Sequence, residues 1–276
     1  MGDPRISHRT VQRVTAAGAE RREDAVAVER PLEIRVDGRA LAVTLRTPGD
    51  DEDLVLGFLA SEGAIARRTD VAGLRVAAAE CPGDSDRAEL ALAPGVRLDW
   101  ARLERHFAAS SACGLCGRAH LDVLRAGLDP APPGPPLDLA ALAALPERLR
   151  AGQRAFTETG GLHAAAWCDE ALAPRVLRED VGRHNAVDKV AGWLLARGEH
   201  PAGRGVLWVS GRIGAEIVLK AARARIPVLA AVGAPSTLAV DLARAAGMAL
   251  VGFLREGRMN AYAGAERLGL PAQARA

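Results

Sequence analysis

Residues 205–254 read GVLWVSGRIGAEIVLKAARARIPVLAAVGAPSTLAVDLARAAGMALVGFL, and this stretch decides the fold of the chain. Short apolar runs alternate in it with longer segments whose apolar residues recur at helical spacing. The runs are the expected strands 205–209, 226–231 and 248–254, and the longer segments are the expected helices 213–225 and 237–246. Such an alternation predicts a layered α/β sheet flanked by helices.

The same rhythm continues upstream as far as a Pro-rich segment, residues 129–137. Proline cannot continue a helix or a central strand, so we interpret this segment as a linker or an exposed loop. Downstream of it we expect the helices 139–150 and 184–197 and the strands 162–168 and 175–177. We therefore place one α/β domain at residues 138–276.

The first half of the chain has a different pattern. Apolar residues alternate on both sides of Asp37-Gly38, which is typical of a β-hairpin. The elements expected to follow are a helix over 50–63, strands over 74–78 and 88–92, and a helix over 98–107. This pattern predicts a smaller α+β part at residues 26–128. Residues 1–25 are polar and have no clear period, so we expect a loosely ordered arm there.

The composition is that of an ordinary globular protein, and it disfavours several classes of function. The 36 basic and 34 acidic residues leave a net charge of only +2, so no excess of positive charge favours binding to nucleic acid. No apolar run approaches the roughly 20 residues that a membrane-spanning helix needs. The N-terminus lacks an apolar signal core, and four cysteines in 276 residues do not make a secreted disulfide framework. We expect a cytoplasmic protein without a membrane or nucleic-acid partner.

The sharpest local feature is SSACGLCG at residues 110–117, where two thiols lie among small residues. Glycines let such a loop bend freely, and backbone amides or Arg118 could stabilise the nucleophilic thiolate. Half of a zinc site with His120, a dithiol redox pair or incidental surface cysteines would also produce this pattern. Because the sequence offers no obvious fourth ligand, we expect no structural metal. Cys81 and Cys168 are isolated and are expected to pack as small hydrophobic residues.

Three loops follow the expected strands of the second half, and the third of them covers residues 255–260. In a layered sheet the ligand usually lies beyond the carboxyl ends of the strands, and free N–H groups at helix starts attract phosphate oxygens. Ordinary turns and helix caps also explain each loop taken by itself. Together the loops favour a nucleotide pocket. The candidate residues in the first two loops are Ser210, Gly211, Arg212, Gly233 and Ser236.

EDVGRHNAVDK at residues 179–189 is dense in ionisable groups directly before an apolar helix. His184 and Asp188 would lie one turn apart on one face of that helix, where they could hold a ligand or orient a proton donor. A capped helix with a solvated first turn has the same spacing. The spacing alone therefore leaves both interpretations open.

These motifs occur together with four others. They are RTPGDDED at 46–53, FTETGGLH at 156–163, VSGRIGAEIVLKAA at 209–222 and GFLREGRMNAYAGAERL at 252–268. With this set the chain resembles the formate dehydrogenase accessory sulfurtransferase family, FdhD, over most of residues 25–270. The resemblance implies a cytidine-deaminase-like three-layer α/β sheet in the C-terminal part, and it implies a homodimer.

By this resemblance, the protein accepts persulfide sulfur from a cysteine desulfurase on Cys113, with Cys116 as an assisting thiol. It transfers the sulfur to the bis(molybdopterin guanine dinucleotide) molybdenum cofactor, its bound substrate, before insertion into formate dehydrogenase. GDP is then a possible analogue of the substrate. The cofactor-binding segment of the family falls on Phe253, Leu254, Arg255, Glu256, Gly257 and Arg258. The two arginines of this segment are well suited to a pyrophosphate.

A deaminase-like fold does not here imply deaminase activity. The chain lacks the H-x-E and P-C-x-x-C signatures that hold catalytic zinc, because His163 is followed by Ala164-Ala165 and Ala112 precedes Cys113. Two other functions stay open. One is a chaperone that binds the molybdenum cofactor and uses its cysteines only in docking, and the other is a thiol-disulfide oxidoreductase.

Overall fold

The structure is a computed structural model that describes residues 2–270 except 80, 82–83, 102, 104–129, 135 and 201. Among the described residues, the first part of the chain forms a ribbon and a small sheet that is covered by α-helix α1. Its elements are β1 (Ile6–Thr15), β2 (Gly18–Ala27), β3 (Arg30–Val36), β4 (Arg39–Arg46), α1 (Asp51–Ser61), η1 (Arg68–Asp70), β5 (Val71–Ala77) and β6 (Asp86–Leu92).

The second part forms a larger sheet with helices on both faces. Its helices are α4 (Leu139–Ala143), α5 (Leu145–Arg150), α6 (Arg154–Thr159), α7 (Arg183–Ala196), α8 (Ala215–Arg223), α9 (Thr237–Ala245) and η2 (Ala265–Leu268). Its strands are β7 (His163–Cys168), β8 (Pro174–Asp180), β9 (Val206–Val209), β10 (Val228–Ala231), β11 (Ala249–Arg255) and β12 (Arg258–Ala263). Among all described residues, no helix has the length and apolar character required to cross a bilayer.

The larger sheet has the strand order β12-β11-β10-β9-β7-β8. Strands β9, β10 and β11 run parallel, as the alternating pattern predicts, whereas β7 and β12 run antiparallel to their neighbours. The carboxyl ends of the three parallel strands and the amino end of β7 therefore lie at one edge. The expected loop at 255–260 is instead a tight turn that leads into β12, an edge strand that the sequence did not predict.

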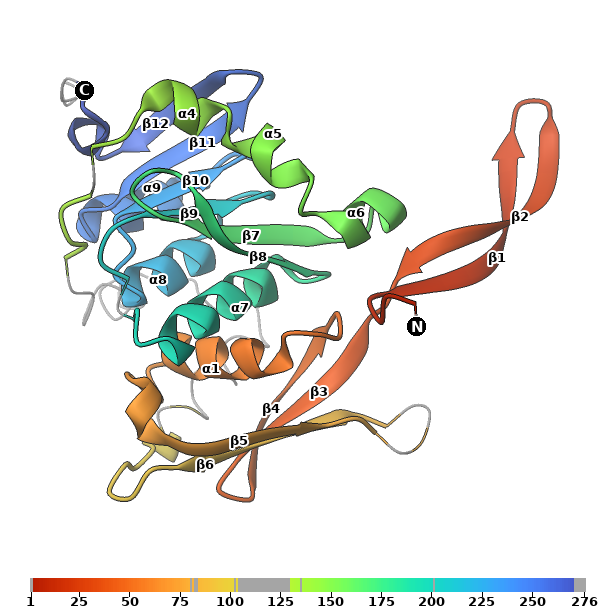
Figure 1. Ribbon diagram of the computed structural model, residues 1–276, viewed down its shortest axis with the longest axis horizontal. Coiled ribbons are helices and arrows are strands. Elements are labelled where there is room, and N and C mark those ends of the chain that lie inside the picture. Colours follow the sequence, from red (N-terminus) through yellow and green to blue (C-terminus); the bar gives the residue numbers. More distant parts are fainter. Residues whose placement is uncertain are drawn as a thin grey trace.

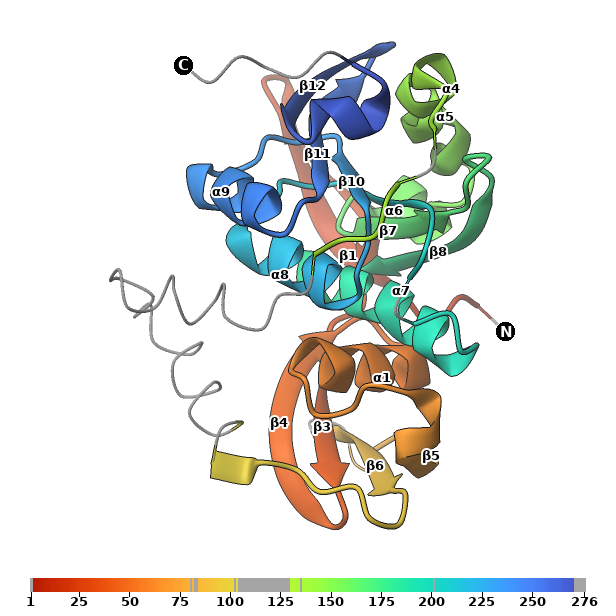
Figure 2. The ribbon, with the colours of Figure 1, turned by 90° about the vertical axis from the view of Figure 1, so that its left-hand side faces the viewer.

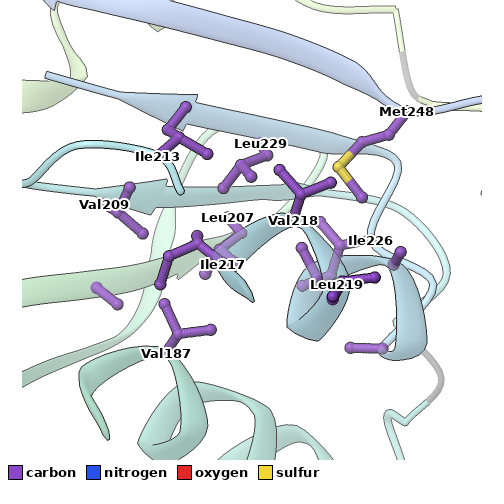
Figure 3. Packing of buried hydrophobic residues seen from close by; sticks show 14 of the residues in the cluster. Val187, Leu207, Val209, Ile213, Ile217, Val218, Leu219, Ile226, Leu229 and Met248 are labelled. Carbon is purple, nitrogen blue, oxygen red and sulfur yellow. The ribbon is translucent and has the colours of Figure 1, made fainter. Parts of the chain in front are cut away.

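Helices cover both faces of this sheet, so both faces are buried. Successive side chains of a strand point to opposite sides, and each face therefore has its own cluster of buried side chains. On the face covered by α7, α8 and α9, the side chains of Val187, Leu207 and Ile217 belong to one cluster (Figure 3). On the face covered by α4 and α5, Leu145 and Trp208 belong to a second cluster. The predicted α/β fold, with helices on both faces of the sheet, is confirmed.

The smaller sheet has the order β4-β3-β6-β5, and α1 covers one of its faces. Leu32 and Ile34 of β3 and Leu54 of α1 are fully buried in this third cluster. The predicted hairpin, helix and two further strands are all present, so the α+β character of this part is confirmed. Of the helix expected at 98–107, residues 102 and 104–107 lie outside the described residues, and the described Trp100, Ala101 and Leu103 are helical.

Residues 1–25 differ from the loosely ordered arm that we predicted. β1 and β2 pair antiparallel, from Ile6 with Ala27 to Thr15 with Gly18, and the ribbon projects from the body of the molecule (Figure 1). Arg5 anchors its base through an ion pair of 2.9 Å with the buried Glu179. Most side chains on both faces of the ribbon are exposed, so no apolar alternation marks its strands. Backbone hydrogen bonds, rather than a buried face, define this hairpin.

The described residues of the Pro-rich segment contain neither helix nor strand, as predicted. They do not form a free linker, however. The N–H of Ala131 donates to the carbonyl oxygen of Ala246 at 2.8 Å, and Arg267 donates to the carbonyl oxygen of Pro132 at 2.6 Å. This segment therefore lies against the C-terminal domain.

Helix α1 also contacts α7, and this contact joins the two parts of the chain (Figure 2). Gly57 of α1 and Gly192 of α7 lie where the helices cross. A Cβ atom at Gly57 would overlap the carbonyl group of Asp188, and one at Gly192 would overlap that of Asp53. Only glycine permits so close an approach of two backbones.

Gly192→Ala is expected to lower the free energy of unfolding by about 1–3 kcal/mol, because the added methyl group forces the crossing helices apart. Urea unfolding followed by circular dichroism measures this loss. Gly73→Ala is a matched control, since no atom lies within 4 Å of a Cβ built at Gly73. A Gly192→Ala protein as stable as the wild type would contradict the close crossing.

Candidate functional site

A cavity of about 730 Å³ lies at the carboxyl edge of the larger sheet. Its volume is in the range of small-molecule binding sites. One wall comes from α5, α6 and residues 160–162, and the other comes from the strand ends and the β11–β12 turn. The lining residues with polar or aromatic side chains are Glu147, Arg150, Gln153, Phe156, His163, Trp208, Ser210, Arg255 and Glu256.

The three predicted loops meet beside this cavity. The N–H of Gly233 donates to the carbonyl oxygen of Gly211 at 3.0 Å, and that of Phe253 donates to the carbonyl oxygen of Gly233 at 3.1 Å. A Cβ atom at Gly233 would come within 2.9 Å of the Cα of Arg212, so glycine is required there. The expectation that these loops gather at one edge agrees with the structure.

The candidate residues of the first two loops have different surroundings. Ser210 lines the cavity, and its hydroxyl oxygen accepts a hydrogen bond of 2.9 Å from the N–H of Ala164 at the start of β7. Ser236 caps α9 instead, accepting from the N–H of Ala239 at 3.2 Å. Arg212 is exposed. The capping interpretation therefore holds for Ser236, whereas Ser210 forms part of the cavity wall.

The residues of segment 253–258 also differ in whether their side chains line the cavity. Arg255 and Glu256 line the cavity, and the guanidinium of Arg255 lies 5.7 Å from the centre of the Phe253 ring. Leu254 is fully buried in the core below the sheet. Arg258 forms an exposed ion pair of 2.8 Å with Glu256 and does not line the cavity. Gly257 takes a positive φ of 70° in the turn between them.

Positive charge surrounds the half-buried imidazole of His163 at this edge. Burial lowers the pKa of His163 below its ordinary value of 6.5, and the nearby charges of Arg183, His184 and Arg212 lower it further. Neither Arg183 nor Arg212 forms an ion pair with any residue that the structure describes. An anion bound at the edge would relieve this repulsion.

The motif at 179–189 forms a buried polar network. The ammonium group of Lys189 lies 2.8 Å from Asp180, with 1% and 0% of the two side chains exposed, and it donates to the carbonyl oxygen of Thr47 at 2.9 Å. Asp180 also accepts from the N–H of Thr47 at 3.1 Å. These bonds tie the amino end of α7 to the smaller sheet. They give Asp180 and Lys189 a structural role.

His184 and Asp188 share one helix face, as predicted, and that face contacts α8. His184 pairs with Glu216 at 2.8 Å, and this hydrogen bond lowers the pKa of Glu216. Asp188 pairs with Lys220 at 2.7 Å and accepts from Ser61 at 2.7 Å, while burial raises its pKa. Two ion pairs thus connect α7 with α8. The motif is therefore a buried structural network rather than the capped helix with a solvated first turn, since no side chain caps the start of α7.

The α5–α6 wall of the cavity was missed in the sequence. Glu147, Gln153 and Phe156 belong to this wall. The sequence pattern predicted only a helix around Glu147, and the motif that begins at Phe156 was given no functional role. The buried Glu179 accepts from the N–H groups of Ala155 and Phe156, at 3.2 and 2.8 Å, and so holds the start of α6. The aromatic ring next to the Gly160-Gly161 pair was the available signal.

The two cysteines of the CGLC motif, Cys113 and Cys116, lie outside the described residues. Cys168 is buried, as predicted, and burial raises its pKa to about 12. Cys81 is exposed in the β5–β6 turn, so the prediction that it packs as a hydrophobic residue was wrong. The described ranges contain no group of His, Cys, Asp and Glu that could hold a metal ion.

The fold and the site define an α/β protein with a ligand-sized cavity, lined by charged residues of both signs, at the carboxyl edge of its sheet. Residues 27–269 match the FdhD/NarQ family, and the chain belongs to this family. The motif-based resemblance is thereby confirmed.

Similar proteins cover the chain almost completely. The sulfur carrier protein FdhD of Streptomyces coelicolor is 48% identical over 270 residues, which are 96% of each chain. That of Nocardia farcinica is 50% identical over 267 residues, 95% of this chain and 94% of the relative. In three dimensions, the chain resembles a putative formate dehydrogenase accessory protein from Desulfotalea psychrophila. The TM-score is 0.76 at 24% identity, covering 96% of this chain and 100% of that one, which supports the fold alone.

Proposed function

We propose that this protein is a sulfur carrier that serves the maturation of formate dehydrogenase. Its Cys113 accepts sulfur from a cysteine desulfurase, and the protein then transfers this sulfur to the bis(molybdopterin guanine dinucleotide) molybdenum cofactor. The observation that carries the proposal is the 47–50% identity, over nearly the whole chain, to relatives named sulfur carrier protein. The CGLC motif supplies the thiols that such a carrier needs.

In the loading step, the thiolate of Cys113 attacks the terminal sulfur of a cysteine persulfide on the donor. The sulfur–sulfur bond of the donor breaks, the donor leaves as a thiolate, and the terminal sulfur becomes a persulfide on Cys113. No net oxidation or reduction accompanies this exchange. Arg255 at the edge of the cavity is suited to bind the pyrophosphate of the cofactor. This contact would hold the cofactor on the carrier protein while the sulfur is delivered.

Isotope-labelled cysteine and a cysteine desulfurase test the proposal. Peptide mass spectrometry of the full-length protein should find one labelled sulfur atom on the peptide that contains Cys113, and none when the desulfurase is omitted. Labelled sulfur should then appear on the molybdenum cofactor. A thiol-disulfide oxidoreductase or a cofactor chaperone would instead leave the protein without transferable label.

Arg255→Ala is expected to weaken the binding of GDP roughly ten- to hundredfold, since charge-assisted hydrogen bonds to phosphate are lost. Calorimetry with the full-length protein measures the change. Arg258→Ala provides the comparison, because Arg258 already pairs with Glu256 outside the cavity. We expect a smaller loss for it than for Arg255→Ala. Equal affinity of the wild type and Arg255→Ala would remove Arg255 from the site.

A further inference from the structure

The base of the β1–β2 ribbon and the α5–α6 wall of the cavity are bound to the same buried carboxylate. Glu179 lies in β8, and none of its side chain is exposed. One of its oxygens accepts from the N–H of Phe156 at 2.8 Å. The other accepts from the N–H of Ala155 at 3.2 Å and from the guanidinium of Arg5 at 2.9 Å. The N-terminal segment is therefore connected to the cavity wall through one side chain.

Arg5 supplies the positive charge that this buried carboxylate needs. Among the residues that the structure describes, no other basic side chain forms an ion pair with Glu179. Asp3 fixes the guanidinium, because its carboxylate accepts from Nε of Arg5 at 2.9 Å and from Nη2 at 2.6 Å. Without Arg5 the carboxylate would be buried and unpaired, a strongly unfavourable state. Movement of Glu179 toward water, and away from α6, would relieve it.

Helix α6 depends on Glu179 because it has no side-chain cap of its own. It is only six residues long, and its N-cap residue Gln153 forms no capping hydrogen bond. The N–H groups of the first turn of a helix need acceptors from elsewhere, and so short a helix is not stable alone. Glu179 supplies two such hydrogen bonds. The position of Phe156, which lines the cavity, thus depends on this carboxylate.

A second contact joins the ribbon to the same wall. β2 contacts α6, so the base of the ribbon lies beside the wall (Figure 1). A Cβ atom at Gly161 would lie 3.2 Å from the Cβ of Ala27, the last residue of β2. Gly161 lines the cavity together with Gly160. The wall is therefore held by the N-terminal segment at both ends of α6.

We infer that Arg5 is a positioning residue for ligand binding in the cavity. It acts through Glu179, which holds α6 and with it Phe156 in the wall. The inference rests on the proposed function, in which the cavity receives the cofactor, and it makes the N-terminal segment part of the binding apparatus. A wall that is not held in place must be ordered by the ligand itself, and this ordering reduces affinity.

The first measurement is amide hydrogen exchange by NMR on the full-length protein without ligand. Arg5→Met should raise the exchange rates of the Ala155 and Phe156 amides about tenfold, since their acceptor is no longer held. Arg13→Met is the matched control in the same ribbon. Arg13 lies 3.9 Å from Glu20, and the two side chains are 58% and 66% exposed. We expect unchanged exchange at both amides in this control.

The second measurement is calorimetry with GDP, on variants whose folding is checked by circular dichroism. Arg5→Met should weaken GDP binding about tenfold, whereas Arg13→Met should bind it like the wild type. Arg5→Lys should lie between Arg5→Met and the wild type in both measurements. Lysine keeps a positive charge beside Glu179 but cannot reproduce the fork that also binds Asp3.

Three outcomes would overturn the inference. They are unchanged exchange of the Ala155 and Phe156 amides in Arg5→Met, faster exchange with wild-type GDP affinity, and a wild type that binds no GDP. The carrier proposal fails separately. Absence of labelled sulfur transfer in the wild type, with the expected exchange and affinity results, overturns that proposal and leaves the role of Arg5 intact.

Discussion

Cys113→Ala is expected to abolish the labelled persulfide and the delivery of sulfur to the molybdenum cofactor. The replacement removes the sulfur atom on which the proposed carrier holds its cargo, and Cys116, the remaining thiol of the resulting AGLC sequence, lies three residues further along the chain. Cys113 lies between Ala112 and Gly114, so one further alanine changes little else in the local sequence. Mass spectrometry after incubation with desulfurase and labelled cysteine measures the loss.

Two comparisons make this result specific. GDP affinity and the melting temperature of Cys113→Ala should match those of the wild type, which separates lost chemistry from lost folding. Cys116→Ala should retain the loaded persulfide, because the second thiol assists rather than carries. A full-strength labile sulfur adduct on Cys113→Ala would assign the carrier role to another thiol.

Lys189→Met is expected to lower the free energy of unfolding by about 3–5 kcal/mol, the typical effect of removing one partner from a buried ion pair. Methionine retains most of the side-chain volume but leaves Asp180 buried without its counter-charge. The main-chain oxygen of Thr47 loses its bond of 2.9 Å to the ammonium group at the same time. Urea unfolding followed by circular dichroism measures the change.

Arg204→Met is the control for this variant, because Arg204 and Glu170 form a pair whose side chains are both 55% exposed. Its loss should lie in the range of roughly 0–1 kcal/mol for surface ion pairs. Asp180→Asn combined with Lys189→Met removes both buried charges and should be less destabilising than Lys189→Met alone. A single variant with the stability of the control would exclude a structural role for Lys189.

Much of the fold was predictable because burial leaves a periodic signal. The fully buried strands β9 and β10 are short apolar runs, and the hairpin at Asp37-Gly38 alternates because one face of its sheet is buried under α1. The β1–β2 ribbon has no buried face, so its sequence has no such period. β12 was missed for a related reason, since it lies at the edge of the sheet and contains the polar residues Arg258 and Asn260.

The site was predictable only where it depends on strand ends. Loops after parallel strands meet at one edge in any sheet of this type, and for this reason Ser210 was identified. Arg255 was assigned to cofactor binding through the family resemblance. Neighbouring residues in a strand face opposite sides, which explains why Leu254 enters the core while Arg255 reaches the cavity. The α5–α6 wall depends on how two short helices pack against the sheet, and no local pattern in Glu147 or Phe156 encodes that packing.

The position of α1 between the smaller sheet and α7 has a consequence for synthesis on the ribosome. Ser61 and Asp188, which meet in the finished protein, are 127 residues apart. At about 5–20 residues per second, translation of that interval takes roughly 6–25 s. During this time the α7-facing side of α1 has no partner helix to cover it. The contact between α1 and α7 can therefore form only after the residues of α7 have been translated.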